Sequence, residues 1–151
     1  MRSTHAAEAV AELGSLALMV VRYAKSYVDQ LYEAKDMFAL EGVIEVVGRD
    51  RQLPEQFWLS KRLFAWCLWS GDGIWQYYEA ISQDDFNAVA SALDRFHLLE
   101  LAARYRSGME TWRAPDYCGE LDRWIDLHMA ELEGTAFQLI ANDRHYLYDE
   151  S

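Results

Sequence analysis

Apolar residues recur at helical spacing along almost the whole chain. The clearest pattern lies near the C-terminus, where one narrow stripe passes through Leu121, Ile125, Leu132, Ala136 and Ile140. Steps of four and seven residues place such side chains on one face of a helix. No segment shows the strict alternation that is typical of a half-buried strand. The pattern predicts an all-α fold, a single compact bundle of six or seven helices.

The N-terminal part predicts a helical hairpin over residues 1–50. Its first arm is one long helix from Ser3 to about Tyr32, in which apolar residues alternate in steps of four and three. This stripe fits either a helix of the bundle or the seam of a homodimer. The second arm runs from Asp36, a plausible N-cap, to Val47, and Gly48 is a plausible stop.

A polar segment, residues 48–54, separates the hairpin from a helical core at 51–151, and we expect both to form one domain, 1–151. Pro54 opens a helix that is apolar almost all round and ends at the turn Ser70–Gly73. A short aromatic helix follows over residues 74–81. Ser82 then caps a helix whose stripe continues to Gly108, with a break near Arg95–His97 left undecided.

The last predicted helix, from about Glu120 to Ala141, is amphipathic and acidic. The chain has 25 acids and 14 bases, a net charge of −11, and residues 116–151 hold nine of the acids and two of the bases. This balance argues against direct nucleic-acid binding, because phosphates require Lys and Arg opposite them. It favours a basic protein partner. We expect two acidic rails along the apolar stripe, and the candidate protein-binding residues are Asp116, Glu120, Asp122, Asp126, Glu131, Glu133 and Asp143.

Catalytic, metal and cofactor chemistry finds no support in the residue spacing. Cys67 and Cys118 are expected to be free thiols, and none of the four histidines has the spacing of a metal site. The longest uncharged apolar run, Leu13–Val21, is too short to span a bilayer and does not resemble a leader. We therefore expect a cytoplasmic protein without cofactor or metal that is not an enzyme.

The segment Trp69–Tyr78 resembles a motif of the bacterial DNA-mimic protein family, which is otherwise classed as a domain of unknown function. Five positions match it: Gly73, Ile74, Gln76, Tyr77 and Tyr78. Asp72 departs from the usual Gly, and no Gly stands near His97, where the family breaks a helix. The resemblance implies an all-α fold with an acidic surface that occupies the DNA-binding face of another protein.

The leading hypothesis is therefore a non-enzymatic acidic binding protein, a DNA mimic that covers the basic surface of a protein such as a transcriptional regulator. An alternative is an immunity or antitoxin-like protein that neutralises a basic toxin. A third interpretation is an enzyme or small-ligand-binding protein that uses the aromatic cluster around Trp66, Trp69, Trp75, Tyr77 and Tyr78.

Overall fold

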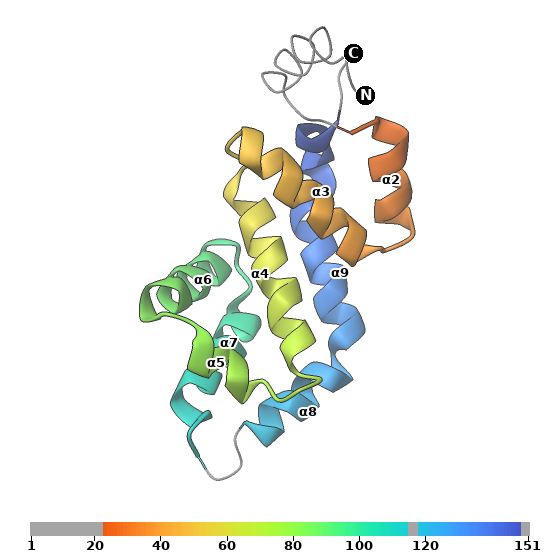
Figure 1. The fold of residues 1–151 in the computed structure, drawn as a ribbon. Coiled ribbons are helices and arrows are strands. Elements are labelled where there is room, and N and C mark those ends of the chain that lie inside the picture. The colour runs from red at the N-terminus through yellow and green to blue at the C-terminus, as the bar shows by residue number, and fades with distance from the viewer. Residues whose placement is uncertain (1–22, 115–117, 149–151) are drawn as a thin grey trace, which may run out of the picture. The chain divides into compact units, whose positions relative to one another are not determined.

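Helices account for most of the residues that the computed structural model describes, which are 23–114 and 118–148 (Figure 1). These ranges contain eight α-helices, one 3-10 segment and no strand, so the predicted all-α class is confirmed. The predicted number of six or seven helices is wrong. None of the helices in the described ranges is long and apolar enough to cross a membrane.

The chain divides into two compact units. The first unit is Met1–Leu53 together with Arg144–Ser151, and the second is the continuous stretch Pro54–Asp143. The division after Leu53 falls inside the polar segment 48–54 in which the sequence places the end of the hairpin. That the two units behave as one domain stays a prediction.

The first unit contains α2 (Lys25–Glu33) and α3 (Met37–Asp50). The predicted cap is present, since the Asp36 carboxylate accepts a hydrogen bond from the Ala39 N–H at 3.1 Å. α3 continues past Gly48 to Asp50, because the backbone becomes extended only at Arg51. The apolar stripe of α3 is buried as the periodicity predicts: Met37, Leu40, Val43, Ile44 and Val47.

The prediction of one continuous helix from Ser3 to about Tyr32 is wrong at residues 23 and 24. Most of that helix, Ser3–Arg22, lies outside the described residues, and so does most of the predicted dimer seam. At Ala24 the backbone is extended, and the Tyr23 N–H donates to the Leu147 carbonyl at 3.0 Å. Pairing with the C-terminal segment therefore occupies the backbone that a continuous helix would use, and α2 begins only at Lys25.

A charged cluster around Asp29 joins the C-terminal segment to α2. The Asp29 carboxylate pairs with Lys25 at 2.7 Å and with Arg144 at 3.1 Å, and it accepts a hydrogen bond from the Tyr148 hydroxyl. The Arg144 guanidinium also lies 4.3 Å from the centre of the Tyr32 ring. The segment that closes the first unit is thus held by this charged cluster, by the backbone bond from Tyr23 and by the fully buried Leu147 side chain.

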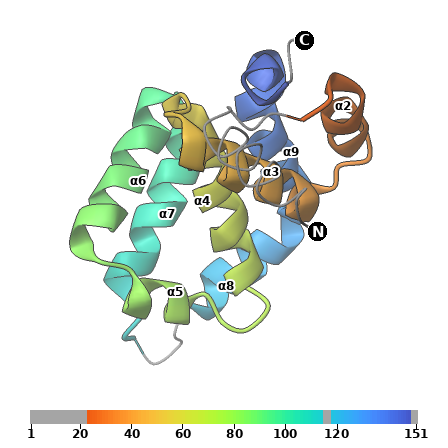
Figure 2. The same ribbon diagram turned by 45° about the horizontal axis from the view of Figure 1, so that its top comes forward.

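The second unit is built around α4, which lies along α9 (Figures 1 and 2). The Ser60 hydroxyl, fully buried in α4, donates to the Ala136 carbonyl of α9 at 2.7 Å. The helices of this unit are α4 (Glu55–Trp69), α5 (Trp75–Ala80), α6 (Gln83–Arg95), α7 (Leu99–Thr111), α8 (Gly119–Leu127) and α9 (Met129–Ile140). A 3-10 segment, η1 (Ala141–Leu147), then kinks at Asp143, where the second unit ends.

Two breaks account for the number of helices: the one near His97, which the sequence left undecided, and one at His128, which it did not predict. α6 ends at Arg95, and His97 adopts a left-handed conformation, φ +61°, before α7 begins. The predicted last helix is divided at His128, which has a φ of −110°. There the Trp124 carbonyl bonds to both the His128 N–H and the His128 ring Nδ1, so a side chain competes with the helical pattern.

Hydrogen-bonded aromatic residues form the core of the second unit. The Trp66 indole N–H donates to the Tyr78 hydroxyl at 3.0 Å, and that hydroxyl donates to the Tyr105 carbonyl at 2.6 Å. The Tyr77 and Tyr105 hydroxyls are 2.5 Å apart. Burial is the main cause that raises the pKa of all three tyrosines, so their hydroxyls stay protonated.

Candidate protein-binding groove

The break at His128 changes the predicted acidic rails, because α8 and α9 are separate helices. One predicted flank carries Asp122 and Asp126, which are one turn apart on α8. Asp122 accepts a hydrogen bond from the Ile74 N–H at 2.8 Å, and Asp126 lies 3.4 Å from the Ser70 hydroxyl. This flank therefore faces the turn between α4 and α5, and Asp122 stabilises the start of α5.

The other flank faces α7. Glu120, which is 83% exposed, pairs with Arg104 at 3.7 Å. The Arg104 guanidinium lies 5.0 Å from the centre of the Trp124 ring, and Trp124 stacks on His128 with ring centres 4.5 Å apart. The exposed Glu131, on α9, lines the same cavity as Trp124 and His128, so it continues this flank beyond the break.

The remaining predicted residues lie elsewhere. Asp143 accepts a hydrogen bond from the Gln56 side chain at 2.7 Å. Glu133 is half-buried; burial, and after it the negative charge of Glu133, raises the pKa of the Cys67 thiol to about 12. Asp116 lies outside the described residues. The six of these acids that the structure describes therefore do not form two continuous rails.

Two cavities follow the flank that faces α7. The first, about 240 Å³, lies at the start of α7 and is lined by His97, Glu100, Trp124, His128 and Glu131, among others. The second, about 230 Å³, is lined by Arg104, Thr111, Cys118 and Glu120, among others. Trp124 lines the first cavity and Arg104 lines the second, so the contact between these two side chains joins the cavities. We call the two cavities and this contact the α7 groove.

The α7 groove combines carboxylates with an aromatic surface. Glu100 and Glu131 are both exposed and line the same cavity as Trp124. Leu99 at the start of α7 is 63% exposed, which adds an apolar rim. Carboxylates bind guanidinium and ammonium groups, and an indole attracts the same cations through its π-face. The sequence analysis identified Glu120 and Glu131, but it missed Glu100, Arg104 and Trp124, which only the fold brings beside them.

Neither cysteine has the surroundings of a catalytic nucleophile. Neither forms a disulfide, as predicted, and both are buried. Cys118 adopts a left-handed conformation, φ +64°, and its sulfur lies 3.4 Å from the Thr111 hydroxyl and 3.6 Å from the Gly108 carbonyl. Within the described ranges, no group of three or more His, Cys, Asp or Glu side chains is placed to hold a metal ion.

The aromatic cluster of the third interpretation divides between core and surface. Trp66 and Tyr78 are at most 2% exposed and are hydrogen-bonded within the core, whereas Trp69 is 38% exposed. Tyr77 is 6% exposed but lines an open hollow beside Arg62.

Comparison of the chain with protein-family models, with curated proteins and with solved structures finds no match.

Proposed function

We propose that this protein is a non-enzymatic acidic binding protein whose α7 groove accepts a basic segment of a partner protein. The observation that carries this proposal is the first cavity, where the exposed carboxylates of Glu100 and Glu131 lie beside the Trp124 indole. A partner arginine inserted there would meet negative charge and an aromatic face together.

The charge of the second unit supports the same proposal. It has fifteen acids and seven bases, a net charge of −8 out of −11 for the whole chain. Such a field attracts a basic partner over a distance, and this attraction weakens as salt screens it. The Arg104 guanidinium already lies over the Trp124 ring, and a partner guanidinium would make the same kind of cation–π contact.

In its more specific form, the proposal is that the partner is a DNA-binding protein, such as a transcriptional regulator, whose DNA-binding surface is occupied. The exposed acids of the groove, Glu100, Glu120 and Glu131, would then stand where phosphates stand in a protein–DNA interface. The alternative form is an immunity or antitoxin-like protein that neutralises a basic toxin. The two forms differ in the partner and not in the chemistry of the groove.

The test is affinity capture from a lysate of the source organism, with elution by increasing salt. Wild-type protein is compared with the double variant E100Q/E131Q and with E79Q. Glu79 is an exposed acid on α5 that does not line either cavity of the groove, so it serves as the matched control. In parallel, an oligo-arginine peptide is titrated against the three proteins by calorimetry.

We expect wild type and E79Q to capture the same basic protein, and E100Q/E131Q to bind the peptide about tenfold more weakly. Competition by duplex DNA would identify the DNA-mimic form, and capture of a toxin without such competition would identify the alternative. Equal peptide binding by all three proteins, or binding that does not change with salt, would contradict the groove proposal.

A further inference from the structure

One face of α4 is left partly exposed by the packing of the second unit. Phe57, Leu63, Phe64, Trp66 and Cys67 point into the core and are at most 3% exposed. The face away from them passes through Trp58, Arg62, Ala65 and Trp69, in steps of four, three and four, and a further step of three reaches Asp72 in the following turn. Steps that alternate between three and four form the seam of a coiled coil.

Two open hollows flank the indole of this face. One, about 360 Å³, is lined by Arg62, Ala65, Trp69 and Tyr77, among others, and the other, about 280 Å³, by Ala65, Leu68, Trp69 and Asp72. Ala65 and Trp69 line both hollows. Leu68 and Trp69 are 44% and 38% exposed. A small residue beside a large exposed aromatic residue gives the face both a recess and a projection.

We propose that this face binds the same face of a second copy of the chain, with the two α4 helices antiparallel. In an antiparallel pair, the two helices can cross at the level of Cys67 along the helix axis, although the Cys67 side chain itself points into the core. In this register Ala65 faces Trp69 of the other copy, and Arg62 faces its Asp72. Each Trp69 then fills the recess that the small Ala65 side chain leaves, as a knob fills a hole. Each Arg62 meets a carboxylate, so the face is complementary to itself in charge as well as in shape.

The contacts around Arg62 keep its guanidinium on this face. It lies 3.6 Å from Asp85 and 5.5 Å from the centre of the Trp58 ring, and its side chain is 35% exposed. Asp72 is exposed in the turn that follows α4. An acid and a base of the same seam are therefore both available to a second copy.

A second antiparallel register of the seam, centred between Leu63 and Phe64, is disfavoured. It pairs Trp58 with Trp69 of the other copy and places Arg62 opposite Ala65, so a guanidinium faces a methyl group instead of a carboxylate. Burying a charge without a new partner is costly, and the register centred on Cys67 avoids this cost.

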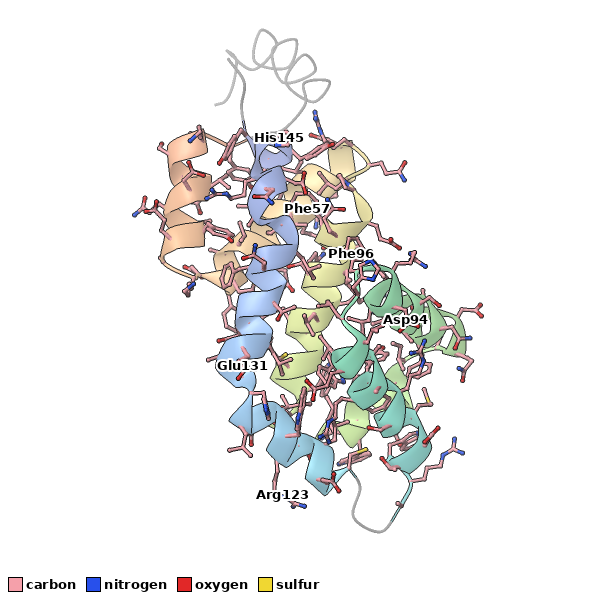
Figure 3. The ribbon with its side chains drawn as sticks, turned by 180° about the vertical axis from the view of Figure 1, so that it is seen from behind. Phe57, Asp94, Phe96, Arg123, Glu131 and His145 are labelled. Atoms are coloured by element: carbon pink, nitrogen blue, oxygen red, sulfur yellow. The ribbon has the colours of Figure 1, made fainter. Side chains whose placement is uncertain are left out.

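The test is sedimentation velocity over a range of concentrations, with charge reversals on the two sides of the proposed ion pair. We expect wild type to shift from a 17.5 kDa monomer toward a dimer of twice that mass as concentration rises. R62D and D72R each place like charges opposite one another, and each is expected to weaken dimerisation at least about tenfold. R123D is the matched control, because Arg123 is exposed on α8 and extends away from the helices (Figure 3).

Mixing the two reversed variants distinguishes this contact from a general effect of charge. In a pair made of one R62D chain and one D72R chain, the first chain has an acid at both positions and the second has a base at both positions. Both contacts of the mixed pair therefore join an acid to a base. The mixture is therefore expected to dimerise more strongly than either variant alone.

R62D also removes the contact with Asp85, so circular dichroism and thermal unfolding of each variant establish that it is folded. W69A, which removes the projection and keeps the charges, is expected to weaken the dimer as well.

A wild type that remains monomeric at every concentration would overturn the proposal. So would a dimer that persists in both R62D and D72R, or two monomeric variants that fail to associate when they are mixed. The proposal does not depend on the α7 groove, because none of the residues on this face of α4 lines either cavity of that groove.

Discussion

Both units bury apolar side chains, but different contacts join the distant segments of each unit. In the second unit, Trp66, Tyr78 and Tyr105 are buried and bonded to one another, so packing and hydrogen bonding act together. In the first unit, the closing contact is a set of charges around Asp29, whose side chain is 21% exposed. We therefore expect changes in side-chain volume to destabilise the aromatic core of the second unit, and changes in pH and salt to weaken the Asp29 cluster of the first unit.

The largest effect is expected from G108A, which tests the packing of the second unit. A Cβ at Gly108 would lie 2.1 Å from atoms of the Tyr78 ring, a distance at which the ring or the helix must move. We expect a loss of about 3 kcal/mol in the free energy of unfolding, measured with urea.

G134A is the matched control for that variant. Gly134 lies within α9 of the same unit, and a Cβ there meets nothing within 4 Å. Alanine is favoured over glycine inside a helix, so G134A is expected to gain about 0.5–1 kcal/mol. Equal destabilisation by both variants would show that the contact with Tyr78 is not the cause.

A smaller effect is expected when only a hydroxyl is removed from the core. Y78F leaves the Trp66 indole N–H and the Tyr105 carbonyl without this partner, and we expect a loss of about 2 kcal/mol. Y105F removes one bond to Tyr77, which lines an open hollow, so about 1 kcal/mol is expected. Urea unfolding that ranks the two variants the other way would contradict this view of the core.

D29N tests the charged cluster of the first unit, with an expected loss of about 1.5 kcal/mol near neutral pH. Hydrogen bonds from Lys25 and Tyr148 lower the pKa of Asp29, so its contribution is present above the ordinary carboxylate pKa and is lost as pH falls through the lowered value. Burial, and after it the bond to Asp29, raises the pKa of Tyr148 to about 12, so its contribution is full below the ordinary tyrosine pKa and is lost as pH rises through the raised value.

The measurement is urea unfolding of wild type and D29N at several pH values. The difference between them should be largest near neutral pH and should disappear in strongly acidic solution, where Asp29 is protonated. A difference that does not change with pH would mean that the Asp29 charge does not stabilise the segment.

The smallest effect is expected from H97G, which is predicted to stabilise the second unit by roughly 0.5 kcal/mol. His97 has a φ of +61°, a conformation that glycine adopts without strain. H97A, which keeps the Cβ and removes the ring, is the control and should not gain stability. Thermal unfolding of the two variants checks the difference, and a gain in H97A would point to the ring instead of the backbone.

Helix starts were the most predictable part of the fold, because their signals are local. The caps Asp36 and Ser82 were both expected from the sequence, and both accept a hydrogen bond from the N–H three residues later. The two breaks were harder to predict, since neither His97 nor His128 is a residue that usually ends a helix. At His128 the break coincides with a φ of −110° and a ring contact with the Trp124 carbonyl, and the apolar periodicity reveals neither of them.

The candidate groove was predictable only in part for a different reason. Glu120 and Glu131 were identified because the acids of the last quarter stand out in the sequence. Their neighbours Glu100 and Arg104 belong to α7, and which flank of α8 faces α7 depends on packing between distant segments. The hydrogen bond between Asp122 and Ile74 was not predictable for the same reason, because these residues are 48 positions apart in the sequence.

The division of the chain has a consequence for the order in which the protein is made. The second unit is one continuous stretch, so all of Pro54–Asp143 is synthesised before Arg144 is added. The first unit begins earlier, but its clamp on Asp29 needs Arg144 and Tyr148. The first unit is therefore the first to be synthesised and the last to be completed. Asp29 of α2 cannot form its contacts with Arg144 and Tyr148 until the C-terminal segment has been made.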